Sequence, residues 1–149
     1  MGIAELPYVD EHTTETVAGT EAVWRALNEV VEASFSSPHA TVYARLVGCP
    51  DRTASGPRPL TKGSVFPGFR VTAATPNRSL TLEGSHRFST YTLTLRLEDT
   101  PEGHTRVHAE TRAAFPGASG TLYRALAIRT GFHTVGMRRL LAGVRRRAE

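Results

Sequence analysis

The C-terminal part of the chain predicts a single helix whose apolar stripe contains two polar side chains. From Ser119 onward, residues spaced three or four apart form one series: Leu122, Leu126, Arg129, His133, Met137, Leu140 and Val144. At 3.6 residues per turn these side chains share one face, and their mostly apolar character indicates that this face is buried. A buried polar group needs a partner. We therefore expect Arg129 and His133 to face a polar-spotted cavity beneath a helix roughly 40 Å long.

Arg129 and His133 are four residues apart, so they are neighbours on this predicted helix. In one interpretation, Arg129 holds an anionic or carbonyl oxygen of a ligand while His133 donates or accepts a proton. In the other, Arg129 pairs with a structural carboxylate such as Glu15 or Glu83, and His133 hydrogen-bonds a strand. Gly131 lies between the two, and a glycine there is able to bend or break the helix.

Length and composition favour one domain, residues 1–149, without metals or disulfides. The single cysteine, Cys49, excludes an internal disulfide and a clustered-cysteine zinc site. The chain shows no charged-then-apolar leader and no apolar run that would cross a bilayer, so we expect a cytoplasmic protein without a membrane partner. Because phosphate loops, dinucleotide fingerprints and metal-ligand spacings are absent, we expect neither a cofactor nor a metal.

The net charge of +4 is concentrated near the C-terminus, in Arg138, Arg139, Arg145, Arg146 and Arg147. Cations at the end of a helix complement its macrodipole and keep the exposed end soluble. The alternative is an interaction patch for nucleic acid or acidic lipid. The chain shows no aromatic platform, recognition-helix motif or zinc spacing beside the arginines, so no nucleic-acid partner is predicted.

The first half of the chain predicts a strand and two short helices. Residues 8–17 are rich in Thr and Val and indicate a polar strand. Thr20 caps a first helix with an apolar face of Val23, Trp24, Leu27, Val30 and Val31. Ser37-Pro38 begins a second, shorter helix that ends at Gly48. A long loop, Cys49 to Gly63, follows.

From residue 69 onward the period changes to two, which indicates strands. Phe69, Val71 and Ala73 alternate first, and Pro76-Asn77 turns the chain. Three further strands follow, and a turn at residues 101–103 separates the last two. The inward residues predicted for the first are Leu80, Leu82, Gly84, His86 and Phe88. Those predicted for the second are Tyr91, Leu93, Leu95 and Leu97, and those for the third are Val107, Ala109, Thr111, Ala113 and Phe115. We expect an α+β fold in which an antiparallel sheet covers the C-terminal helix.

This layout resembles the START-like superfamily, also called SRPBCC. The resemblance is clearest in residues 17–27, which look like the family's strand-to-helix segment with its Val23-Trp24 pair, and it continues in the strand–Pro76–strand segment and the terminal helix. It implies a helix-grip fold, in which a curved antiparallel sheet wraps around a long C-terminal helix and a hydrophobic cavity. Members carry lipids, hormones or aromatic metabolites, and some cyclise or dehydrate polyketide chains, so the fold alone does not set the function.

Several inward side chains are candidates for the walls of such a cavity. His86 shares its strand face with leucines, and Tyr91 does so on the next strand. The predicted ligand-binding residues are Tyr91, Phe88, Leu82, Leu95, Met137, Tyr43 and Phe69. Apolar walls with a few polar groups suit an aromatic ligand that bears carbonyl or hydroxyl groups. The alternative is that His86 and Tyr91 are core residues bonded to backbone.

The functional expectation is a protein, monomeric or homodimeric, that binds a small hydrophobic or aromatic, polyketide-like molecule. In an enzymatic version, the cavity folds a substrate for cyclisation or dehydration, His133 or His86 moves protons and Arg129 stabilises an enolate oxygen. In a non-enzymatic version, a carrier or sensor uses the same residues for affinity alone. An interaction module built on the arginine-rich C-terminus is the third alternative.

Overall fold

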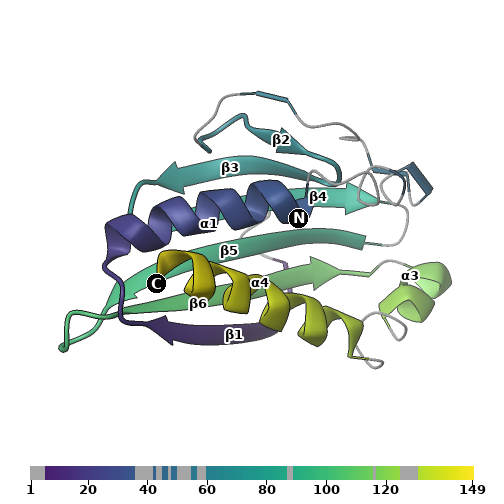
Figure 1. The fold of residues 1–149 in the computed structure, drawn as a ribbon. Helices are drawn as coiled ribbons and strands as arrows, with labels where there is room; N and C mark the ends of the chain where they lie inside the picture. Colours follow the sequence, from purple (N-terminus) through teal and green to yellow (C-terminus); the bar gives the residue numbers. More distant parts are fainter. Residues whose placement is uncertain are drawn as a thin grey trace.

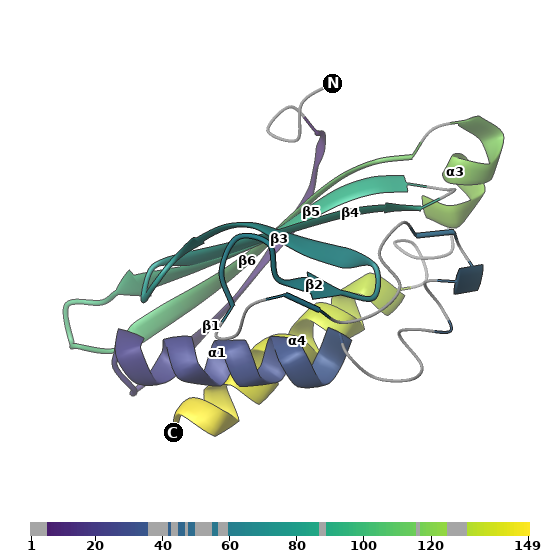
Figure 2. The ribbon, with the colours of Figure 1, turned by 90° about the horizontal axis from the view of Figure 1, so that it is seen from above.

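The computed structural model describes residues 6–35, 42, 45–46, 48–49, 55–56, 60–86, 89–115, 117–124 and 131–149. Its six strands form one antiparallel sheet in the order β1-β6-β5-β4-β3-β2. The strands are β1 (Tyr8–Thr16), β2 (Val65–Phe66), β3 (Phe69–Thr75), β4 (Ser79–His86), β5 (Ser89–Asp99) and β6 (Thr105–Ala114), and the helices are α1 (Thr20–Phe35), α3 (Gly117–Arg124) and α4 (Phe132–Ala148). Helices α1 and α4 lie side by side on the concave face of the sheet (Figure 1). The ends of β4 and β5 nearest α3 lead away from both helices (Figure 2).

The predicted alternation of the central strands is confirmed. In β6, the inward residues Val107, Ala109, Thr111 and Ala113 are buried, and the residues between them are partly exposed. The predicted turn before β4 is also present, with Asn77 at a φ of 63°, a left-handed conformation that Asn adopts more readily than most residues. The helix-grip arrangement predicted for the chain is therefore the observed one.

The alternation predicted for β3 is wrong after Val71. A β-bulge between Val71 and Ala73 shifts the register against β4. A bulge inserts one extra residue and reverses the faces of the residues that follow it. Ala73 is therefore exposed, and Ala74 instead packs against the core.

The hydrophobic core fills one end of the concave face, where α1 and α4 contact each other. The predicted apolar face of α1 is confirmed, since Val23, Trp24, Leu27, Val30 and Val31 are all buried. Val144 of α4 is fully buried in the same cluster, as are Leu80, Leu95 and Val107 of the sheet. The core is thus a packed interior made by α1, the C-terminal half of α4 and the middle of the sheet.

The prediction of one continuous C-terminal helix from Ser119 is wrong. Gly131 precedes α4 with a φ of 82°, a left-handed conformation that a right-handed helix does not contain. Helix α4 thus begins at Phe132, and its 17 residues make it about 25 Å long. Leu122, which the stripe predicted to be buried, is 64% exposed on the separate helix α3.

Two other predictions fall on parts of the chain that are sparsely described. The second short helix lies largely outside the described residues, as does most of the loop from 49 to 63. In the described part of the chain, no helix combines the length and hydropathy that crossing a bilayer requires.

Two glycine-to-alanine substitutions test the left-handed backbone conformation of Gly131 and hence the start of α4. Gly131→Ala is expected to lower the free energy of unfolding by about 1 kcal/mol, because a Cβ is strained in this conformation. Gly136→Ala, within α4 and with no atom within 4 Å of the new Cβ, is expected to raise it by about 1 kcal/mol. Urea denaturation measures both. Stabilisation by Gly131→Ala would instead indicate a helix that runs through position 131.

Candidate functional site

Two groups of side chains lie on the concave face towards the end of α1 and the start of α4, and the first of them packs against the core. The first, here called the aromatic cluster, comprises Phe35 at the end of α1, Phe69 at the start of β3, Tyr91 at the start of β5 and His86 at the end of β4. The second, here called the imidazole pair, comprises His12 of β1 and His133 of α4, with Asp10 between them. We call the part of the concave face that carries both groups the concave site.

The rings of the aromatic cluster form a continuous row. Phe35 and Phe69 are stacked, with centroids 4.6 Å apart, and Phe69 meets Tyr91 edge to face at 5.2 Å. His86 lies beyond Tyr91, with ring centroids 5.5 Å apart. Each such ring pair contributes about 0.5–1.5 kcal/mol of stabilisation beyond that from the area it buries. The ring contacts therefore hold these side chains in place relative to one another.

Tyr91 is fixed in place by a hydrogen bond across the sheet. Its hydroxyl donates to the carbonyl oxygen of Gly68 at 2.5 Å, and the sulfur of Cys49 lies 3.9 Å from the same hydroxyl. The ring passes over Gly84, where a Cβ would collide with the Gly68 carbonyl oxygen and approach the ring to 2.8 Å. Gly84 therefore allows the ring to lie flat on the strand. The backbone hydrogen bond left open as an alternative for Tyr91 is present.

His86 is half-buried at the end of the row. Burial lowers the pKa of His86 below its ordinary value of 6.5, because a desolvated imidazole resists taking a proton. Its Nε2 lies 3.4 Å from the hydroxyl of Ser89, across the β4–β5 pair. At neutral pH the site therefore presents an uncharged imidazole beside the Tyr91 ring.

The imidazole pair joins the first strand to the last helix. Nε2 of His133 lies 3.0 Å from Oδ1 of Asp10, and Nε2 of His12 lies 3.1 Å from Oδ2 of the same carboxylate. The rings of the two histidines are 6.4 Å apart. Both histidine side chains are 18% exposed and that of Asp10 is 25% exposed, so the group is partly shielded but reachable from outside.

Thr111 lies on the neighbouring strand, directly opposite Asp10. Residues opposite each other on adjacent strands share a face, so both side chains belong to the concave site. The Thr111 hydroxyl is buried and has no hydrogen-bond partner among the described residues. A buried hydroxyl without a partner is uncommon and indicates that hydrogen bonding at this position is incomplete.

The remaining predicted site residues have different positions. Met137 of α4 and Phe69 are partly buried beside the core. Leu82 and Leu95 have no exposed area and belong to the packed core, so a ligand would reach them only by displacing their neighbours. Arg129, Phe88 and Tyr43 lie outside the described residues.

Asp10 and His12 were missed by sequence reasoning. The signal was present in the two-residue spacing of an acid and an imidazole within a Thr-rich strand, which places both on one face. Their partner, His133, follows Asp10 by 123 residues, so no local pattern links them. Within the described part of the chain, no group of three or more His, Cys, Asp or Glu side chains has an arrangement that would hold a metal ion.

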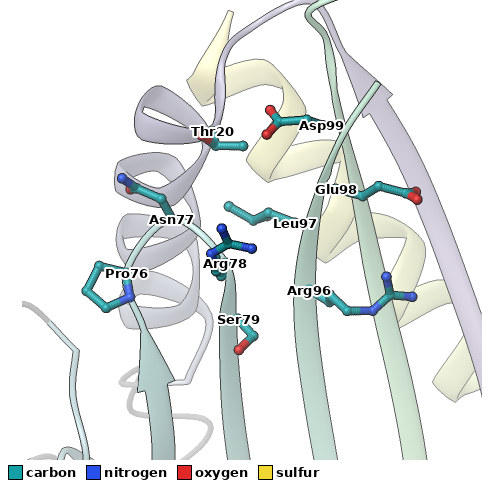
Figure 3. A pocket seen from close by; sticks show the side chains of 9 residues that line it. All are labelled: Thr20, Pro76, Asn77, Arg78, Ser79, Arg96, Leu97, Glu98 and Asp99. Atoms are coloured by element: carbon teal, nitrogen blue, oxygen red, sulfur yellow. The ribbon is translucent and has the colours of Figure 1, made fainter. Parts of the chain in front are cut away.

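A surface pocket of about 680 Å³ lies elsewhere, at the turn between β3 and β4 beside the start of α1 (Figure 3). Polar and charged side chains such as Arg78, Arg96 and Glu98 dominate its lining. Several of these charges are already balanced, since Arg96 lies 3.8 Å from Glu11 and Glu98 contacts His108 at 3.0 Å. No residue of the concave site lines this pocket, and its open, charged surface does not suit an apolar ligand.

Comparison with known proteins identifies the fold. No family model matches the chain, and no curated protein is similar in sequence. Among solved structures, a structural-genomics protein of Nitrosospira multiformis is 16% identical with a TM-score of 0.61, covering 96% of this chain and 97% of its own. The di-domain ARO/CYC StfQ of the steffimycin biosynthetic pathway is 12% identical with a TM-score of 0.62, covering 93% of this chain.

DynU16, from the dynemicin biosynthetic locus, is 18% identical with a TM-score of 0.54 and covers 91% of this chain. The chain spans about half the length of StfQ and DynU16, 49% and 46% respectively. Identities this low establish architecture and not activity. Together with the sheet order and the paired helices, they show that the chain has an α+β helix-grip fold.

Proposed function

We propose that this protein binds a small, largely apolar aromatic molecule at the concave site, beside the aromatic cluster. The observation that carries the proposal is the row of rings Phe69, Tyr91 and His86, each partly exposed on the face that α4 covers. Aromatic walls with a few polar groups are the usual lining of sites for such ligands. The rings contribute contact area, and the polar groups select the orientation of the ligand.

The strand register between the aromatic cluster and the imidazole pair supports this placement. Tyr91 lies opposite Ala113 of β6, and Leu93 lies opposite Thr111, which in turn lies opposite Asp10. Aromatic cluster and imidazole pair are therefore two strands apart, about 10 Å across the sheet. Ala113 and Leu93 are buried, so a flat ring system would lie between Tyr91 and the imidazole pair only after the side chains that cover these two residues move.

Within this function, an enzymatic and a non-enzymatic version remain. Cyclisation or dehydration of a polyketide-like molecule requires groups that move protons, and the described candidates are His86 and His133. The ARO/CYC description of StfQ favours this version, with Arg129 as a predicted stabiliser of an enolate oxygen. A carrier or sensor would use the same wall without turnover. Because Tyr91 already donates its hydroxyl hydrogen to Gly68, we assign it affinity rather than proton transfer.

Binding of 2-methoxynaphthalene, an aromatic ether without an acidic hydrogen, tests the proposed function. Isothermal titration calorimetry is expected to show saturable binding that Phe69→Ala weakens about tenfold, because an aromatic wall is lost. Leu122→Ala removes an exposed leucine from α3 and is the matched control, expected to leave the affinity unchanged. No saturable binding, or equal losses in the two variants, would contradict the proposal.

The lowered pKa of His86 predicts a specific pH dependence of stability. Between the folded-state pKa and 6.5, the unfolded chain binds more protons at His86 than the folded protein does. The contribution of the neutral imidazole is therefore complete above pH 6.5 and is lost as the pH falls through the lower folded-state value. Urea denaturation should show that acidification narrows the difference in the free energy of unfolding between the parent protein and His86→Gln. Parallel pH profiles would show that His86 is not buried as described.

A further inference from the structure

The shared carboxylate of Asp10 fixes how its two histidines are protonated. An ionised carboxylate only accepts hydrogen bonds, so His12 and His133 each donate to it through Nε2. In a neutral imidazole, the hydrogen at Nε2 leaves the lone pair on Nδ1. Asp10 thus holds both rings in the same tautomer, with Nδ1 as the acceptor atom.

The Nδ1 atoms of His12 and His133 have no donor within the described part of the chain. A contrasting case is His108 on the outer face of the sheet, whose Nδ1 contacts Glu11 at 2.8 Å and whose Nε2 contacts Glu98 at 3.0 Å. Among the described residues, His108 thus has both ring nitrogens in contact with carboxylates, whereas His12 and His133 each have only Nε2 in such a contact.

The negative charge of Asp10 restricts which ligand groups donate a hydrogen bond to Nδ1 of His12 or His133. In the described part of the chain, no Lys or Arg side chain pairs with Asp10. A carboxylate or phosphate of a ligand would be repelled by the Asp10 charge, which no cation among the described residues offsets, whereas a neutral hydroxyl would not be repelled. The incomplete hydrogen bonding at Thr111, opposite Asp10, adds a polar group that a ligand oxygen would satisfy after rotation of the Thr111 side chain.

We propose that His133, positioned by Asp10, accepts the proton of a weakly acidic hydroxyl, a phenol or an enol, of the ligand bound at the concave site. This inference rests on the proposed function and names the chemical class of its ligand. The O–H bond breaks, the proton passes to Nδ1 of His133 and the electron pair stays on the oxygen as a phenolate or enolate. The resulting imidazolium lies 3.0 Å from the Asp10 carboxylate, which stabilises its charge. The proton returns to the oxygen when the ligand leaves.

A purely structural role is the competing account, since the same hydrogen bonds tie α4 to β1. The two accounts differ in what the ligand hydroxyl contributes. A structural link would support binding of any aromatic molecule equally. A proton acceptor distinguishes a hydroxyl from an ether on the same ring system.

The test compares 2-naphthol with 2-methoxynaphthalene by isothermal titration calorimetry. The parent protein is expected to bind 2-naphthol about tenfold more tightly. Asp10→Asn and His133→Gln are each expected to reduce this ratio to about one while the affinity for the ether changes little. His108→Gln, which alters the imidazole on the opposite face, is the matched control and is expected to keep the ratio.

Long-range proton–nitrogen NMR spectra of the imidazoles supply a readout that needs no ligand. We expect the Nε2–H tautomer at His12 and His133 in the parent protein, and a mixture of tautomers in Asp10→Asn. Equal affinities for the two naphthalenes in the parent protein, equal losses of both in the variants, or an Nδ1–H tautomer at His133 would overturn the inference. Failure of the ether itself to bind would overturn the proposed function and this inference together.

Discussion

Burial of the facing apolar sides of α1 and α4 against one end of the sheet is the constraint on which the rest of the structure depends. Val23 and Leu27 of α1, Val144 of α4 and Val107 of the sheet have no exposed area, so this end is closed. Packing of this kind fixes the helices relative to the strands. The opposite end of the concave face is then left to rings and hydrogen-bonding groups, which is where we place ligand binding.

The Asp10 carboxylate determines how that second end is organised. It contacts His12 within its own strand and His133 at the start of α4, so the helix is held to β1 by polar bonds where the apolar core ends. Towards the opposite edge of the same face, the Tyr91 hydroxyl holds β5 to the β2–β3 turn by donating a hydrogen bond to the carbonyl oxygen of Gly68. Two hydrogen-bonded anchors therefore flank the buried residues Leu93, Thr111 and Ala113 of β5 and β6.

Much of the fold was predictable because its signals are local. The alternation in β5 and β6 and the helical face from Val23 to Val31 depend on residues a few positions apart, and each was predicted correctly. The break at Gly131 was not, since side-chain periodicity does not report a backbone φ of 82°. The bulge after Val71 likewise reverses a pattern that the sequence alone continues.

The candidate site was harder to predict from the sequence, because its contacts join residues that are far apart in the chain. Strand alternation identified the inward face that carries His86 and Tyr91, but it did not tell which end of that face is packed solid. Leu82 and Leu95 share the face with Tyr91 and yet lie in the closed core. Asp10 and His12 gain their significance only from His133, a contact formed between the two ends of the chain.

The most direct test of the central claim is a crystal structure of the protein with 6-bromo-2-naphthol, in which anomalous scattering locates the bromine. Our account predicts the ring system on the concave face against Phe69 and Tyr91, with its hydroxyl oxygen within hydrogen-bond distance of Nδ1 of His133. Bromine in the charged pocket at the β3–β4 turn, or on the outer surface of α4 alone, would contradict it.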